Sequence, residues 1–154
     1  MRVYLAGPDV FFADAAARAA RMKAECARLG LVGVFPLDPA PGPLPDAPEW
    51  QRIFAANEAH IRSCDAMVAN ITPFRGPSAD VGTAWEMGFM RALGRPVAAW
   101  TEDPRDYAPR VAPDGLLVEE FGLADNLMLE GGARVFRGQH AFARALQSLS
   151  ISSE

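Results

Sequence analysis

Residue types that form cross-links and metal sites are scarce in this 154-residue chain, which has two cysteines and two histidines. Cys26 and Cys64 fall within segments that we expect to be helical, and their spacing is not that of paired zinc ligands. So few cysteines suit a reducing cytoplasm better than a disulfide scaffold. With only His60 and His140 as further ligands, we expect no metal site and a cytoplasmic location.

Long apolar runs and a basic surface are also missing. No stretch approaches the roughly 18 apolar residues of a membrane span, and the N-terminal MRVYLAGPDVFF lacks the apolar run and cleavage site of a signal peptide. The formal net charge is −4, and the lysine and arginine residues form no stripe. These features argue against a membrane protein and against a nucleic-acid-binding surface.

Familiar phosphate-binding and nucleophile motifs are absent as well. The chain has no G-x-G-x-x-G, no Walker-type lysine and no G-x-S-x-G. It therefore lacks the signatures of a dinucleotide site, of a triphosphate site and of an α/β-hydrolase nucleophile.

Half of the residues are hydrophobic, which is enough for one domain of residues 1–154 with a substantial core. Short β-rich runs alternate with stretches of helical periodicity. We expect strands at 2–6, 31–37, 66–71, 96–101 and 133–136. We expect helices at 14–30, 49–64, 80–94, 119–129 and 138–149, and loops at 39–48 and 102–118.

This alternation predicts an α/β fold: a parallel sheet covered by helices on both faces, in a three-layer α/β/α sandwich. We expect the flavodoxin-like, doubly wound strand order 2-1-3-4-5. Ligands of such sheets bind beyond the carboxyl ends of the strands, where the winding reverses, here between strands 1 and 3. The segments that reach this crevice are 4–12 and 70–86.

Two acids mark the otherwise apolar helix expected at 80–94. Asp80 stands at its start, and Glu86 follows between Trp85 and Met87. One interpretation makes Asp80 a helix cap and Glu86 a solvated residue. The other notes that apolar neighbours leave Glu86 little polar surface, and that carboxylates withdrawn from water are enriched at catalytic sites. Such a carboxylate can attack an anomeric carbon and form a covalent ester.

Asn57 is a second anomaly, because it lies on the apolar face of the helix expected at 49–64, among Trp50, Ile53, Phe54 and Ile61. Its amide either bonds to neighbouring backbone or points at a ligand over the strand ends. Tyr4, in the middle of the first strand, fits either a core position or a functional one.

Glycine–proline corners end two of the expected strands. Gly7 in AGP, and the turn PFRG at 73–76, allow a ligand to approach the backbone closely. Phe11, Phe12 and Phe74 either pack in the protein or form a stacking wall for a flat heterocycle. We also place Gly82, at the start of the expected helix, among the substrate-binding residues.

Three segments of the chain resemble the nucleoside 2-deoxyribosyltransferase family: YLAGPDVF, CDAMVANITPFRGPSADVGTAWEMG and FGLADNLML. The resemblance runs in order over essentially the whole chain, and its central motif is long and specific. It implies a flavodoxin-like enzyme that swaps the base of a 2′-deoxyribonucleoside or releases that base to water.

The resemblance also implies roles for individual residues. Glu86 matches the nucleophile, and Asp80 matches the acid that holds the sugar 5′-hydroxyl. Tyr4 matches the tyrosine that orders the nucleophilic carboxylate. Asn126 and Met128 match residues that a neighbouring subunit donates to the sugar pocket, so the resemblance implies at least a homodimer, with a hexamer as a larger possibility.

Asn57 matches a base-contacting position at which some members of the family carry aspartate. An aspartic acid there could protonate the departing base, whereas an amide can only form hydrogen bonds. Either another group or water supplies the proton, or the base preference differs.

The expected reaction is a retaining double displacement through a deoxyribosyl–Glu86 ester, with no cofactor and no metal. Hydrolysis is expected as a side reaction, and the substrates are nucleosides and free bases. The alternative on the same fold is a nucleoside hydrolase or a 5′-monophosphate N-glycosidase. In the latter, the resemblance implies a small hydroxyl residue in place of Asp80, whose carboxylate would repel a phosphate dianion.

A non-enzymatic flavodoxin-like module is a third reading. A phospho-receiver needs an acidic cluster after strand 1 and an aspartate at the end of strand 3, where this chain has Ala6-Gly7-Pro8 and Asn70. A flavin carrier needs a phosphate loop rich in serine and threonine, which is also missing. Both are therefore disfavoured.

Overall fold

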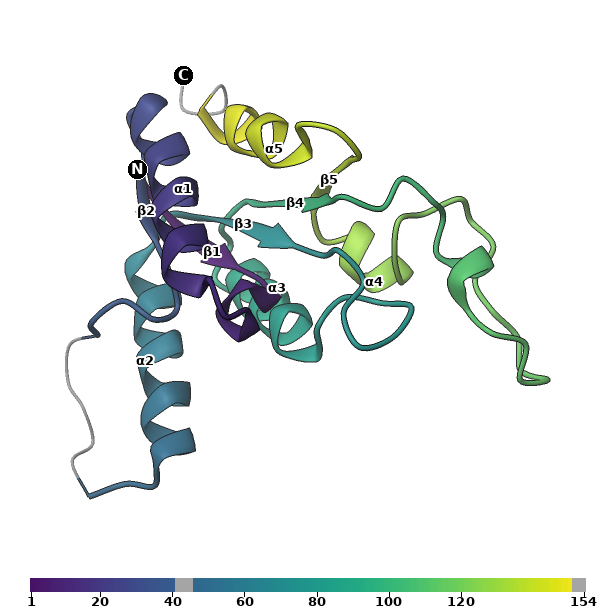
Figure 1. Cartoon of the computed structure of the whole chain (residues 1–154), viewed down its shortest axis with the longest axis horizontal. Coiled ribbons are helices and arrows are strands. Elements are labelled where there is room, and N and C mark those ends of the chain that lie inside the picture. The colour runs from purple at the N-terminus through teal and green to yellow at the C-terminus, as the bar shows by residue number, and fades with distance from the viewer. Residues whose placement is uncertain (41–45, 151–154) are drawn as a thin grey trace.

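A computed structural model describes residues 1–40 and 46–150 (Figure 1). Its centre is a parallel five-stranded sheet in the order β2-β1-β3-β4-β5, which confirms the predicted strand order. The strands are β1 (Arg2–Ala6), β2 (Val32–Val34), β3 (Ala66–Asn70), β4 (Val97–Thr101) and β5 (Arg134–Arg137). Every residue of β3 and β4 is buried, as expected for apolar strands covered on both faces.

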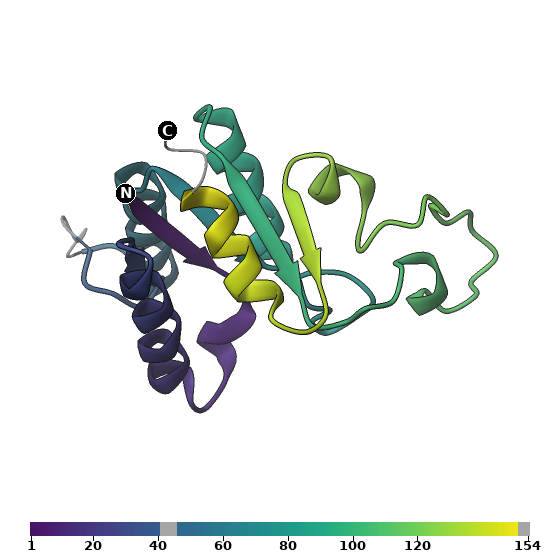
Figure 2. The ribbon, with the colours of Figure 1, turned by 90° about the horizontal axis from the view of Figure 1, so that it is seen from above.

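Helices form a layer on each face of the sheet (Figures 1 and 2). The helices are α1 (Ala15–Arg28), α2 (Glu49–Ser63), α3 (Val81–Ala92), α4 (Leu127–Glu130) and α5 (Ala141–Ser150), with short 3₁₀ helices η1 (Pro8–Phe11) and η2 (Ala108–Arg110). Helices α1 and α5 share one hydrophobic core with the sheet. Residues of α2 and α3 share the other core with the opposite face. The three-layer prediction is therefore confirmed.

Two expected elements differ most from the structure, the strand at 31–37 and the helix at 119–129. The strand expected at 31–37 is shorter, because a turn follows β2: the amide of Asp38 donates to the carbonyl of Phe35 at 2.9 Å, and the Asp38 carboxylate accepts from the amide of Phe35 at 3.0 Å. The expected loop at 39–48 lies partly outside the described residues.

The helix predicted at 119–129 is wrong except at its end, where α4 forms. Gly122 has a φ of 70°, which no right-handed helix accommodates. Asn126 caps α4 by accepting from the amide of Met128, and the Glu119 carboxylate accepts from the amide of Leu127. Residues 102–126 instead form a largely irregular arm that extends from the edge of the sheet (Figure 2).

Candidate active site

The structure brings Tyr4 and Glu86 together on the face of the sheet that α3 covers. Tyr4 lies in the middle of β1 and is fully buried. Its hydroxyl donates a 2.7 Å hydrogen bond to Oε1 of Glu86 on α3, across 82 residues of sequence. Met87 and Met90, from the buried face of α3, pack in the same core as Tyr4. This packing holds the helix, and with it the carboxylate, against the sheet.

The pKa of Glu86 is raised to about 7, chiefly by burial; the hydrogen bond from Tyr4 lowers it, and the negative charge of Asp80 contributes to the rise. Burial and the neighbouring Glu86 carboxylate raise the pKa of Tyr4 well above its ordinary value. Tyr4 therefore remains a hydrogen-bond donor at neutral pH. A carboxylate with these properties is poised between its acid and its nucleophilic form.

The raised pKa of Glu86 predicts a pH-dependent cost to stability. In the unfolded chain Glu86 ionises near pH 4.5, and in the folded protein near pH 7. The loss in the free energy of unfolding is therefore absent below pH 4.5 and complete above pH 7. At 1.36 kcal/mol per pKa unit, it amounts to roughly 3 kcal/mol. Glu86→Gln is therefore expected to be more stable than the wild type at pH 8, but not at pH 4.5, in urea unfolding. An equal gain at both pH values would contradict this account.

Asp80 is the N-cap of α3, as the simpler interpretation of the sequence predicted. Its Oδ2 accepts from the amide of Thr83 at 3.1 Å and from the Thr83 hydroxyl at 3.4 Å. Its Oδ1 has no hydrogen-bond partner among the described residues and remains available to a ligand. Capping and ligand binding are therefore compatible. Gly82 is exposed, and a Cβ there would lie 3.0 Å from the Asp80 carboxylate.

A buried polar network lies where β1 and β3 end. Asp9, which is 3% exposed, accepts from the Asn70 side-chain amide at 2.8 Å and pairs with Arg18 at 3.0 Å. Asn70 in turn accepts from the amide of Thr72 at 3.0 Å. Neither Asp9 nor Asn70 was predicted as a site residue. The sequence signal was a polar residue at the end of apolar β3 and another shortly after apolar β1.

Gly7 connects β1 to this network, and its substitution has a predictable cost. A Cβ at Gly7 would lie 2.7 Å from Cβ of Asn70, and the φ of Gly7 is 153°. Gly7→Ala is therefore expected to lower the free energy of unfolding by roughly 1–3 kcal/mol. Gly76→Ala is the control, because a Cβ there meets no atom within 4 Å. Urea unfolding measures both; equal stability of the two variants would refute the close packing at Gly7.

Two of the three phenylalanines singled out in the sequence pack against each other. The rings of Phe11 and Phe74 stack with centroids 5.4 Å apart and an interplanar angle of 13°. The guanidinium of Arg75 lies over both rings, 5.2 and 4.8 Å from their centroids. Phe12 is paired differently, with Arg18 over its ring. Phe11 is more than half exposed, so part of the pair remains accessible beside Arg75.

Asn57 lies on α2 between Phe54 and the fully buried Ile61, one turn from each. Phe54 contacts the ring of Trp85, the neighbour of Glu86, at 5.4 Å. The Oδ1 atom of Asn57 is buried and has no partner among the described residues. An orphaned buried acceptor costs free energy, and a donor on a ligand would relieve that cost.

Asn126 and Met128 line an apolar cavity of about 830 Å³ between α3 and α4, together with residues of α3 other than Glu86. The Asn126 side-chain amide donates to Glu119 at 2.9 Å, and Met128 is 76% exposed. The Asn126 side chain is therefore bound to Glu119 within its own chain, whereas most of Met128 is accessible.

Among residues 1–40 and 46–150, no group of three His, Cys, Asp or Glu side chains is arranged to hold a metal ion. No helix in the same part of the chain is long and apolar enough to cross a membrane.

A flavodoxin-like sheet binds small ligands beyond the carboxyl ends of its strands, and a buried carboxylate with a raised pKa is typical of a functional site. The family model for nucleoside 2-deoxyribosyltransferases matches residues 3–128. The chain belongs to this family of glycosyl-transferring and glycosidase enzymes, whose substrates are nucleosides and nucleobases.

Several individual proteins and solved structures are similar to this chain. An uncharacterised protein of Schizosaccharomyces pombe is 31% identical and aligns with 96% of this chain and 88% of its own. The 2-deoxyribosyltransferase from Leishmania mexicana is 34% identical, with a TM-score of 0.77 over 95% of this chain and 97% of that one. A CMP N-glycosidase from Clostridium botulinum shares the fold, with a TM-score of 0.55 and 16% identity over 99% of both chains.

Proposed function

We propose that this protein is a nucleoside 2-deoxyribosyltransferase that exchanges the base of 2′-deoxyribonucleosides, with all 154 residues acting as one domain in the cytoplasm. The observation that carries the proposal is the 2.7 Å hydrogen bond from buried Tyr4 to Glu86. Together with the pKa of about 7, it supplies an oriented carboxylate that is substantially ionised at neutral pH.

In the proposed mechanism, Glu86 attacks C1′ of the sugar while the N-glycosidic bond breaks through an oxocarbenium-like state. The base departs with the bonding electrons and takes up a proton, leaving a deoxyribosyl ester on Glu86. A second base then attacks C1′ from the side that the first base left, gives up its ring N–H proton to water, and releases the carboxylate. Two inversions at C1′ give net retention.

Other residues bind the substrate in this mechanism. Tyr4 orients the carboxylate, and the unpartnered Oδ1 of Asp80 accepts a hydrogen bond from the 5′-hydroxyl. Phe11 and Phe74 offer a flat surface to the base, and Gly7 lets the substrate approach the backbone. The amide of Asn57 contacts the base but cannot protonate it, so we assign that proton to water. Water attack on the ester gives hydrolysis as a side reaction.

The second candidate is a 5′-monophosphate N-glycosidase. The Clostridium botulinum protein of the same fold is named a CMP N-glycosidase. Asp80 argues against this second candidate, because a carboxylate would repel a phosphate dianion. Asp80→Ser is therefore expected to raise the ratio of monophosphate to nucleoside turnover, by roughly tenfold or more if about 1.4 kcal/mol of repulsion is removed. Release of base from dCMP and from deoxycytidine measures the ratio. An unchanged ratio would refute the role of Asp80.

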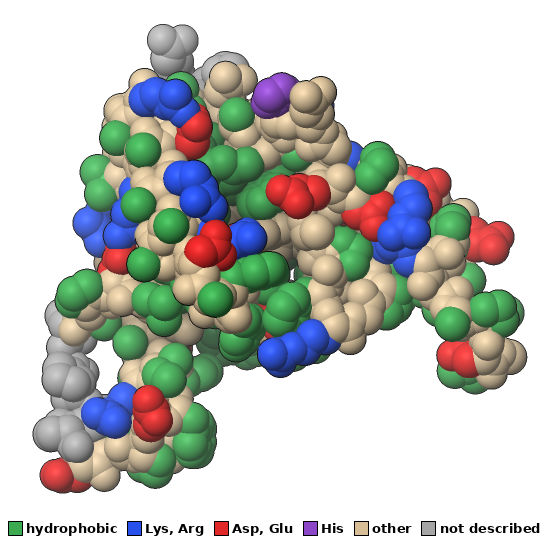
Figure 3. Space-filling view, viewed as in Figure 1, with side chains coloured by type: hydrophobic (Ala, Val, Ile, Leu, Met, Phe, Trp, Pro, Cys, Tyr) green, Lys and Arg blue, Asp and Glu red, His purple; other side chains and the backbone are tan. Residues whose placement is uncertain are grey.

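We further propose that the enzyme is at least a homodimer, in which Asn126 and Met128 complete the neighbour's site. Large apolar side chains are exposed on α2, α3 and α4: Trp50, Phe54, Val81, Trp85 and Met128. Hydrophobic side chains are visible over the part of the molecule occupied by α2 in Figure 3. Exposed apolar surface of this kind is typical of interaction sites, and a hexamer is the larger assembly that we consider.

The test of the function is chromatography after incubation with 2′-deoxyinosine, with and without adenine. New 2′-deoxyadenosine supports the transferase. Hypoxanthine alone, whether or not adenine is present, would make the protein a nucleosidase. Release of bases only from nucleoside monophosphates would favour the second candidate.

A further inference from the structure

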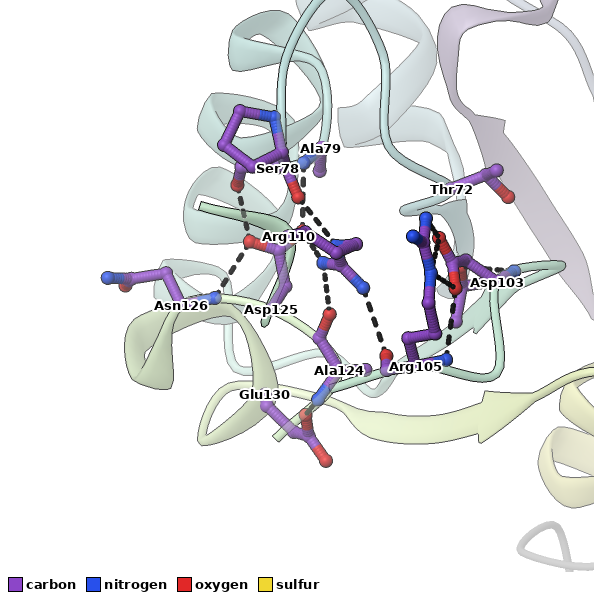
Figure 4. A network of polar contacts seen from close by, with 12 residues as sticks. Thr72, Ser78, Ala79, Asp103, Arg105, Arg110, Ala124, Asp125, Asn126 and Glu130 are labelled. Atoms are coloured by element: carbon purple, nitrogen blue, oxygen red, sulfur yellow. Dashed lines mark hydrogen bonds and ion pairs between the residues drawn. The ribbon is translucent and has the colours of Figure 1, made fainter. Parts of the chain in front are cut away.

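Asp125 is a fully buried acid that the proposed mechanism does not use. Its Oδ1 accepts hydrogen bonds from the Ser78 hydroxyl and, at 2.7 Å, from the amide of Asn126. Its Oδ2 accepts from the amide of Ala79 at 2.8 Å. One carboxylate thus joins two segments that are 46 residues apart in sequence (Figure 4).

Arg110 supplies the counter-charge, with a side chain that is 3% exposed and lies 3.9 Å from Oδ2 of Asp125. Its guanidinium donates to the carbonyls of Pro77, Arg105 and Ala124 at 2.9, 3.0 and 2.6 Å. The cation therefore fastens the arm at 102–126 to the segment that leads into α3. A buried charge with this many partners holds one geometry, because any shift leaves polar groups unsatisfied.

The two segments that Asp125 joins both lead to proposed substrate contacts. Ser78 and Ala79 directly precede Asp80, which we assign to the 5′-hydroxyl in its own chain. Asn126 directly follows Asp125, and we assign it, together with Asp80, to the 5′-hydroxyl in the sugar pocket of the neighbouring chain. Asp125 itself is 0% exposed and touches no substrate in this scheme.

We propose that Asp125 is a positioning residue that sets the place of Asp80 in its own site and of Asn126 in the neighbour's site. One buried carboxylate thereby links the 5′-hydroxyl contacts of two active sites. This inference rests on the proposed function. It predicts that disturbing Asp125 harms only the recognition of the 5′-hydroxyl, and does so in both chains.

The first test compares 2′-deoxyinosine with 2′,5′-dideoxyinosine, which lacks the 5′-hydroxyl. Asp125→Asn removes the charge but keeps the size of the side chain. We expect kcat/KM for 2′-deoxyinosine to fall roughly 10- to 100-fold, the effect of a small misplacement of a binding group. The value for the dideoxy substrate should stay close to that of the wild type. Equal losses on both substrates would mean a general structural role and would overturn the proposal.

Two further variants keep this test decisive. Ser78→Ala removes one hydrogen bond to Asp125 and leaves the Asp125–Arg110 pair intact, so it replaces Asp125→Asn if that variant does not fold. It should lower kcat/KM by less, and again only for the substrate with the 5′-hydroxyl. Asp106→Asn is the matched control, because Asp106 is a half-exposed acid of the same arm that pairs with Arg137 at 2.6 Å. It should leave both substrates unaffected, and a loss equal to that of Ser78→Ala would overturn the specific role.

The second test uses hybrid oligomers of Asp125→Asn and Glu86→Ala chains. In a hybrid, the site that can react is the one that contains Glu86, and it belongs to the Asp125→Asn chain. Its Asp80 therefore lies beside the substituted residue, whereas its Asn126 comes from the Glu86→Ala chain, in which Asp125 is intact. Activity per site that can react is expected between that of the Asp125→Asn homo-oligomer and that of a wild-type/Glu86→Ala hybrid. A value equal to either limit would overturn the link between two sites. Absence of any base exchange by the wild type would instead refute the proposed function.

Discussion

Glu86→Gln is expected to lower the rate of base exchange by roughly 10⁴-fold or more, a loss typical of removing a covalent nucleophile. Glutamine has nearly the same shape and can still accept the hydrogen bond from Tyr4, so the fold around it is retained. Its amide oxygen is too weak a nucleophile to form a stable ester with C1′. The rate of 2′-deoxyadenosine formation from 2′-deoxyinosine and adenine measures the loss.

A covalent intermediate makes this prediction sharper. Acid quenching of the wild type with 2′-deoxyinosine should reveal a peptide containing Glu86 that carries one deoxyribosyl group by mass spectrometry. The adduct should be absent from Glu86→Gln. Glu25→Gln is the control, because Glu25 is an acid on α1 that pairs with Arg28; both rate and adduct should be unchanged. A Glu86→Gln enzyme with more than a hundredth of the wild-type rate would exclude the double displacement.

The second large effect is on the pH dependence of kcat/KM, which reports ionisations of the free enzyme. Glu86 must lose its proton before it attacks, and its pKa is about 7. The value of kcat/KM should therefore approach a tenfold fall per pH unit below 7, or roughly 50-fold between pH 7 and pH 5. An ordinary glutamate would give a flat profile over that range, and a flat profile would contradict the assignment.

Two substitutions should move the fall of kcat/KM at low pH, its acid limb, in opposite directions. Tyr4 lowers the pKa of Glu86 by its hydrogen bond, so Tyr4→Phe should shift the limb to higher pH. Asp80 raises that pKa by its charge, so Asp80→Asn should shift the limb to lower pH. Initial rates at low substrate concentration over pH 5–9 measure both. Shifts in the same direction would mean that another group controls the limb.

The fold was largely predictable because its causes lie in local sequence. Strands β3 and β4 are short apolar runs, and the short connections between strands and helices leave few topologies for a parallel sheet. The helix expected at 119–129 failed for a tertiary reason. Glu119 is held by the start of α4 instead of extending a helix, and Gly122 has a left-handed φ.

The candidate site was only partly predictable. Glu86 was recognisable as an acid among apolar residues, and the family resemblance nominated Tyr4 and Asp80. Asp9 and Asp125 are buried and bonded to segments near the candidate site, but the sequence did not indicate either of them. Their partners lie 61 and 46 residues away in sequence, and no local pattern reports a contact over such a distance.

The sequence by itself determined the strand order, the apolar layers and the place of each acid along the chain, because these follow from hydrophobic periodicity and short connections. Only the tertiary structure decided the surroundings of these acids. Burial raises the pKa of Glu86, and Asp125 is buried beside Arg110. Distance and exclusion from water control both effects, and the chain acquires them only when segments remote in sequence pack together.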